Sequence, residues 1–257
     1  MNNYSSKSTG SDSRSLEKMP EKLNEQFHYF DIIMSVFVMV LVVSNVASSA
    51  KIVDLHLSLF GIPMAFDGGT ILFPVSYIFG DILTEVYGYK RSRRVIWTGF
   101  ACLALASGFF WLLGTLPGEA TWQTYAGDPA YLAILGGMST GGIVLGSLAG
   151  YWGGEFSNSF VLAKMKILTQ GKYLWMRTIG STLVGELVDS VVFVAIATLF
   201  GVFPWSLFIT LAVTNYVFKT TIEVIMTPLT YIFVNYFKKV EKVDFYDIGT
   251  NFNPFQL

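Results

Sequence analysis

Thr70–Lys90 reads TILFPVSYIFGDILTEVYGYK, and the rest of the chain is organised around this stretch. It begins as an apolar run long enough to enter a lipid bilayer, and it then places Asp81 and Glu85 four residues apart. Residues at this spacing share one face of a helix, with Tyr77 one turn earlier. Because carboxylates inside a membrane span are costly, the pair indicates a functional site.

The composition of the whole chain is that of a helical membrane protein. Of its 257 residues, 53% are hydrophobic and 14% are charged, against roughly 25% charged in soluble domains. Several apolar runs of about 20 residues can each cross a hydrocarbon core of about 30 Å. The sequence therefore predicts an all-α, polytopic membrane protein. The net charge of −1 gives no sign of a nucleic-acid partner, and the single cysteine, Cys102, predicts neither a disulfide nor a thiolate metal site.

We expect six transmembrane helices. They cover approximately residues 30–50, 70–90, 95–116, 139–163, 179–203 and the run from 207 onward, which Pro228 kinks. The segment 51–67 contains Gly61 and Pro63 and is expected to be a loop. The predicted parts of the chain are a disordered cytoplasmic tail (1–26), a six-helix transmembrane transport domain (27–240) and a cytoplasmic C-terminal tail (241–257).

The basic residues predict the orientation of these helices. With the N-terminus inside, all but two of the 17 lysines and arginines fall in cytoplasmic segments. The exceptions are Lys51, at an external helix end, and Lys219, inside the last span. This asymmetry follows the positive-inside rule and predicts a multi-pass protein of the cell (inner) membrane with both termini cytoplasmic.

Two further patterns concern helix packing and symmetry. Gly142, Gly146, Gly150 and Gly154 recur every four residues, which predicts a small-residue seam for close helix packing. Residues 77–81 (YIFGD) and 182–186 (TLVGE) each place a carboxylate after a glycine, with a second carboxylate three or four residues later. This echo is consistent with a 3+3 inverted repeat of the kind found in many secondary transporters.

Six ionisable residues fall within the predicted spans. At about 3 kcal/mol each, exposing all six to lipid would cost on the order of 18 kcal/mol, so they must face one another or a wet cavity. Lys219 is the single cation, with Glu223 on the same helix as its nearest candidate partner and Asp189 as the next. A purely structural hydrogen-bond network is one interpretation. Five carboxylates for one lysine instead favour protonated carboxylates, a cation or a donor-rich ligand. The six are Asp81, Glu85, Glu186, Asp189, Lys219 and Glu223.

The central motif also resembles that of a known family. Residues 73–81 (FPVSYIFGD) followed by 84–88 (TEVYG) resemble the signature of the queuosine-precursor transporters, also called the vitamin uptake transporter family. The resemblance continues through Asn45, residues 177–190 (RTIGSTLVGELVDS) and Lys219 with Glu223, and it covers about residues 30–237. It implies an importer of 7-cyano-7-deazaguanine, 7-aminomethyl-7-deazaguanine or both, which are precursors of the tRNA base queuosine.

The chemistry of the polar residues fits such a ligand. A carboxylate can accept two N–H donors from a guanine-like edge, an asparagine can both donate and accept, and an aromatic ring such as Tyr77 or Phe73 can stack on the base. We expect no cofactor and no metal. The predicted substrate-binding residues are Asn45, Tyr77, Asp81, Glu85, Glu186, Asp189, Asn215, Lys219 and Glu223.

Three functions stay open at this point. The first is a stand-alone secondary transporter. The second is the substrate-capturing membrane subunit of an ATPase-driven uptake system for a vitamin or nucleobase. The third is a receptor-like or structural membrane protein. An enzyme is not expected, because no catalytic motif is present. The oligomeric state is also open, a homodimer included.

Overall fold

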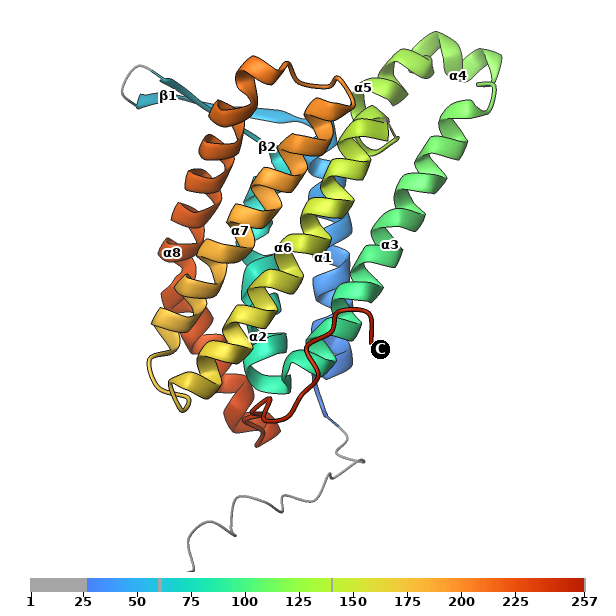
Figure 1. The fold of residues 1–257 in the computed structure, drawn as a ribbon. Helices are drawn as coiled ribbons and strands as arrows, with labels where there is room; N and C mark the ends of the chain where they lie inside the picture. Colours follow the sequence, from blue (N-terminus) through green and yellow to red (C-terminus); the bar gives the residue numbers. More distant parts are fainter. Residues whose placement is uncertain (1–26, 60–61, 140, 257) are drawn as a thin grey trace, which may run out of the picture.

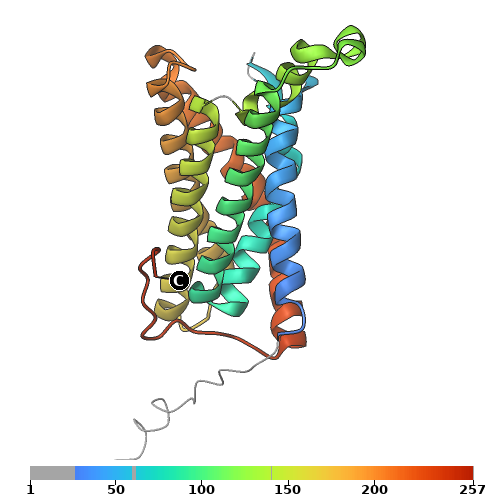
Figure 2. The same ribbon diagram turned by 90° about the vertical axis from the view of Figure 1, so that its right-hand side faces the viewer.

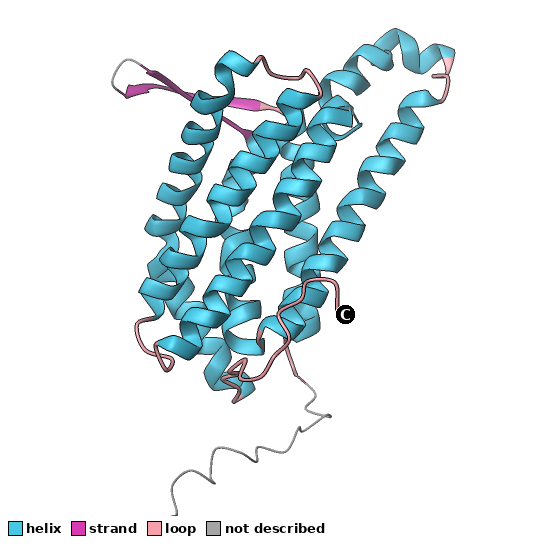
Figure 3. Cartoon of the chain, viewed as in Figure 1, coloured by secondary structure: helices cyan, strands magenta, loops and turns pink. Residues whose placement is uncertain are grey.

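The computed structural model describes residues 27–59, 62–139 and 141–256, which form a bundle of long helices with one β-hairpin (Figure 1, Figure 3). The elements are α1 (Phe30–Ala50), β1 (Ile52–Leu59), β2 (Ile62–Asp67), η1 (Gly68–Ile71), α2 (Phe73–Tyr87), α3 (Tyr89–Thr115), α4 (Ala120–Tyr125), α5 (Gly127–Ser139), α6 (Gly141–Leu168), α7 (Leu174–Leu199), η2 (Trp205–Leu207) and α8 (Phe208–Glu241).

Within the described residues, five helical stretches are long and apolar enough to cross a membrane. The predicted multi-pass character is therefore confirmed by length and composition. The five stretches are Phe30–Ala50, Tyr89–Thr115, Gly127–Leu168, Leu174–Leu199 and Trp205–Glu241.

The helix of the central motif is shorter than the predicted span over 70–90. α2 has 15 residues and is therefore about 22 Å long, less than a hydrocarbon core of about 30 Å. It ends at Gly88, whose φ of 85° turns the chain straight into α3. α2 packs against α1, α3, α6 and α8, and its side chains Ile82 and Val86 have no exposed surface. The motif thus lies at the centre of the bundle, while the six-span topology stays a prediction.

The prediction of a loop over 51–67 was wrong. β1 and β2 pair as an antiparallel hairpin, from Ile52 opposite Asp67 to Leu59 opposite Ile62, with an irregularity between Asp54 and Ser58. The sequence VDLHLSL alternates apolar and polar residues with the period of a strand. Gly61 and Pro63 suggested a loop over the whole segment, whereas the alternating pattern before them indicates a strand.

The predicted small-residue seam is confirmed at the contact between α6 and α7. A Cβ atom added to Gly150 would lie 2.7 Å from Oδ1 of Asp189, and one added to Gly154 would lie 2.8 Å from Cβ of Asp189. Gly185 on α7 faces α6 in the same way, since its added Cβ would lie 3.0 Å from the carbonyl oxygen of Gly154. The glycines bring the two backbones close together and so hold α7 carboxylates against α6.

The C-terminal segment after α8 runs back across one end of the bundle (Figure 1, Figure 2). The backbone N–H of Tyr89 donates to Asp247 at 3.0 Å, and Nη1 of Arg93 donates to the carbonyls of Asn251 and Asn253 at 3.0 and 2.6 Å. The predicted tail 241–257 is therefore docked on α3 as far as Phe255, whose ring packs against Trp97. The predicted N-terminal tail, 1–26, lies outside the described residues.

Basic segments gather at this same end. The α2–α3 turn, the α6–α7 loop and the end of α8 lie together there (Figure 1).

Candidate substrate-binding site

A polar cavity of about 400 Å³ lies inside the bundle, within the range of small-molecule sites. Residues of α1, α2, α3, α5, α6, α7 and α8 line it. All of the predicted binding residues except Asp81 and Glu85 line this cavity: Asn45, Tyr77, Glu186, Asp189, Asn215, Lys219 and Glu223. The structure thus brings together residues that lie far apart in the sequence.

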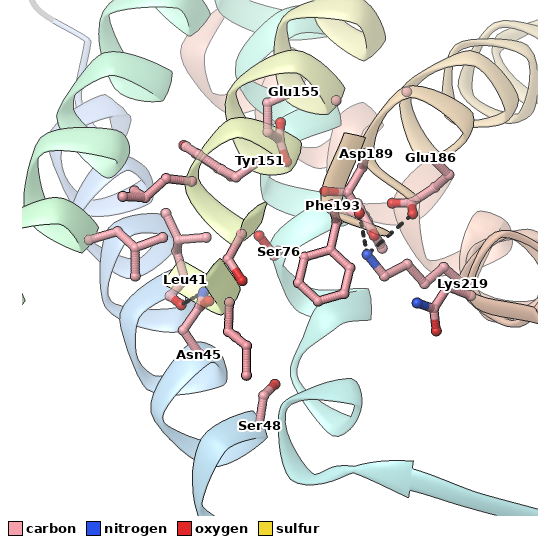
Figure 4. Close-up of a pocket in the computed structure, with 18 of the residues that line it drawn as sticks. Leu41, Asn45, Ser48, Ser76, Tyr151, Glu155, Glu186, Asp189, Phe193 and Lys219 are labelled. Carbon is pink, nitrogen blue, oxygen red and sulfur yellow. Dashed lines mark hydrogen bonds and ion pairs between the residues drawn. The ribbon is translucent and has the colours of Figure 1, made fainter. Parts of the chain in front are cut away.

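Lys219 and two carboxylates of α7 form a charged cluster on one side of the cavity (Figure 4). Its ammonium group pairs with Asp189 and lies 3.6 Å from Oε2 of Glu186. The sequence offered two partners for Lys219, Glu223 first and Asp189 next, and the structure shows the second of them. Glu223 instead accepts a hydrogen bond from the hydroxyl of Thr182. Sequence spacing within α8 could not reveal this choice, because the partners come from α7.

The remaining polar groups come from other helices. Asn45 on α1 and Asn215 on α8 are half-buried at the cavity wall, as is Tyr77 on α2. One N–H of the Asn45 amide already donates to the carbonyl of Leu41 at 2.8 Å. The cavity therefore offers acceptors, amide groups and an aromatic ring, which suits a flat, donor-rich ligand. Phe73, the other aromatic residue predicted to stack on the ligand, has a side chain outside the described part of the structure.

Asp81 and Glu85 do not line the cavity, although they lie one turn apart. Asp81 is buried and accepts a long hydrogen bond of 3.5 Å from Asn158 of α6. Glu85 has no exposed surface and belongs to a separate ion network at the basic end of the bundle. The interpretation of the two as one ligand-binding pair is not matched by this geometry.

The ion network joins α2, α6, α7, α8 and the C-terminal segment. Oε1 of Glu85 lies 2.5 Å from Nη2 of Arg177, 2.6 Å from Nζ of Lys238 and 3.6 Å from Nζ of Lys166. Asp244 accepts from Lys166 at 2.5 Å and lies 2.9 Å from Lys238. The side chains of Arg177 and Glu85 are both fully buried. Removing either one would therefore leave the other as a buried, unpaired charge, which strongly destabilises the fold.

Asp244 is the part of this network that lies beyond the spanning helices. Partial burial acts to raise its pKa, but hydrogen bonds and charges from Lys166 and Lys238 outweigh this effect and hold the pKa below its usual value. The carboxylate is therefore ionised at neutral pH and ties the C-terminal segment to α6 and α8.

The sequence reasoning missed several residues of the cavity wall. Glu155 and Asn158 of α6 line it, with Ser76 of α2 and Tyr151 of α6. A helix over 139–163, as the sequence predicted, would end soon after these two residues. α6 continues to Leu168, so that both residues lie deeper. The sequence signal for this position was the neighbouring Gly154, because the glycine seam to which it belongs packs against α7.

Among the described residues, no group of three or more histidine, cysteine, aspartate or glutamate side chains is arranged to hold a metal ion.

A bundle of membrane-length helices around a polar internal cavity is the architecture of a membrane transport protein. The comparison with known families agrees. The family model described as "Putative vitamin uptake transporter" matches residues 67–233, and the chain belongs to this family.

A curated relative extends the comparison. The chain is 27% identical over 174 residues to a protein of Bacillus subtilis (strain 168) named "Probable queuosine precursor transporter". The match covers 67% of this chain and 72% of the relative. No solved structure matches the chain.

Proposed function

We propose that the chain imports 7-deazaguanine precursors of queuosine across the cell (inner) membrane as a secondary transporter. The observation that carries this proposal is the cavity, whose wall combines carboxylates, amides and an aromatic ring in a protein of a transporter family. The name of the Bacillus relative supports this substrate class. A guanine-like edge carries adjacent N–H donors that one carboxylate can accept together.

In this proposal, each part of the ligand meets a different part of the wall. Glu223 and the α7 carboxylates accept the N–H donors of the six-membered ring. Asn45 and Asn215 face the carbonyl and pyrrole edges, and Tyr77 stacks on the base. Asp81, one turn beyond Tyr77 on α2 and outside the cavity wall, supports the site by accepting a hydrogen bond from Asn158, which lines the cavity.

The proposed topology has six spans with both termini cytoplasmic. η1 and α2 together make the short second crossing, and the hairpin precedes them on the outer side. The ion network around Glu85 then lies at the cytoplasmic end, where it closes the bundle below the cavity. The 3+3 inverted repeat is part of the same proposal, because two such halves supply alternating access around one central site.

Uptake into proteoliposomes tests the function. The purified chain, reconstituted with no ATPase module, is expected to accumulate a labelled deazaguanine. Glu223→Gln keeps the size and the acceptor of the side chain but removes its charge. It should weaken apparent affinity about ten- to a hundredfold, the effect of losing a charge-assisted contact. The matched control is Asp128→Asn, at an exposed site outside the cavity, which should transport normally. Absence of uptake by the wild type, with folding intact, would overturn the proposal.

A further inference from the structure

Glu155 differs from the other carboxylates of the cavity in having no partner. It is 9% exposed and lines the cavity from the middle of α6. Within the described residues it forms no hydrogen bond and no ion pair with any other side chain or backbone group. Figure 4 shows it beside Tyr151, with no hydrogen bond or ion pair joining it to Lys219, Asp189 or Glu186. A buried carboxylate without a partner is unfavourable unless a ligand supplies one.

The lysine of the cavity is already engaged elsewhere. Lys219 pairs with Asp189 and lies 3.6 Å from Glu186, so it neutralises the α7 side of the wall. Glu223 receives only a neutral hydroxyl, from Thr182, and its Oε2 atom is buried without a hydrogen bond. The charged groups that act most strongly on Glu155 are Asp81, Asp189 and Lys219, two of which are acidic. Carboxyl groups therefore outnumber basic groups in the wall near Glu155.

The central motif makes room for this carboxylate. A Cβ atom added to Gly80 would lie 3.3 Å from Oε2 of Glu155, so the carboxylate packs directly over the α2 backbone at the glycine of the YIFGD motif. A larger residue would press it out of place. Gly80 thus serves to position Glu155 toward the cavity, next to Asp81 on the same helix.

We infer that Glu155 binds a positively charged group of the substrate and makes the cavity select an amine-bearing deazaguanine over a neutral one. This inference rests on the proposed function. Of the two precursors, the aminomethyl form carries an ammonium group with three N–H donors. The cyano form offers only a nitrile nitrogen, which is an acceptor and has nothing to accept from a carboxylate.

Binding of the two precursors to the purified full chain, measured by titration calorimetry, tests the inference. The wild type is expected to bind 7-aminomethyl-7-deazaguanine about ten- to a hundredfold more tightly than the 7-cyano form, the range for one charge-assisted contact. Glu155→Gln should bring this ratio to about one, and it should do so by weakening the aminomethyl ligand alone. Glu155→Asp keeps the charge and should retain a preference.

Glu186→Gln is the matched control, because this cavity carboxylate already faces Lys219. It is expected to change both affinities by a similar factor and to leave their ratio as in the wild type. If Glu155→Gln does not fold, Gly80→Ala replaces it, and crowding of the carboxylate should lower the ratio. An equal affinity of the wild type for both ligands, or a ratio that neither variant changes, overturns the inference alone. Binding of neither ligand overturns the proposed function and the inference together.

Discussion

Replacing Glu85 by glutamine tests whether this residue of the central motif holds the bundle together. The carboxylate has no exposed surface and contacts Arg177 at 2.5 Å and Lys238 at 2.6 Å. Glutamine keeps the size of the side chain but leaves the fully buried guanidinium without its counter-charge. Breaking a buried ion pair in this way costs about 3–5 kcal/mol, which corresponds to a fall in melting temperature of roughly 6–20 °C.

The assay is thermal unfolding of the purified variants in the same detergent. Asp128→Asn is the control, and as an exposed substitution it should stay within about 0.5 kcal/mol of the wild type. The double variant Glu85→Gln with Arg177→Gln should recover part of the lost stability, because neither charge is then left alone. If Glu85→Gln melts like the wild type but loses deazaguanine affinity, Glu85 is a ligand-binding residue, and our account of the ion network is wrong.

Three further predictions concern the neighbouring contacts. Lys219→Met should lower stability by up to about 3–5 kcal/mol, with most of the loss restored when Asp189→Asn is added; additive losses in a double-mutant cycle would refute the pair. Asp244→Asn should loosen the C-terminal segment, seen as faster proteolysis after α8. The protection of the C-terminal segment from proteolysis that Asp244 provides should be present above about pH 4 and should be lost as the pH falls through the depressed pKa of Asp244. Protection from proteolysis that does not change with pH would contradict this contact. Gly154→Ala should cost about 1–3 kcal/mol, because its Cβ would lie 2.8 Å from Cβ of Asp189, whereas Gly108→Ala, with nothing within 4 Å, should be harmless; equal stability of the two would argue against the seam.

The membrane class, the central position of the motif and the glycine seam could be predicted from the sequence, because each follows from local composition or spacing. Gly150 and Gly154 are an example: a four-residue repeat of small residues has few uses in a membrane helix other than close packing. The hairpin at Ile52–Leu59 was also readable from its alternation. The alternating pattern predicts a strand there, although the nearby glycine and proline suggested a loop.

The partners of the charged residues could not be predicted, because they depend on how different helices face one another. Asp81 and Glu85 share a helix and lie one turn apart, yet the first meets Asn158 and the second meets Arg177 and Lys238. For the same reason, the sequence favoured Glu223, which lies one turn from Lys219 on α8, over Asp189, which lies on α7. Glu155 was missed for a different reason, namely an error in the boundary of α6 that placed the residue too close to the membrane surface.

The central claim is that the polar cavity inside the bundle, lined by α1, α2, α3, α5, α6, α7 and α8, is the substrate site. An experimental structure of the full chain bound to 7-aminomethyl-7-deazaguanine tests it most directly. We predict the base inside this cavity, with its ammonium group within hydrogen-bond distance of Glu155 and its ring N–H donors facing Glu223 or the α7 carboxylates. A ligand bound elsewhere in the bundle, or one in the cavity with its ammonium group directed away from every carboxylate, would contradict the account.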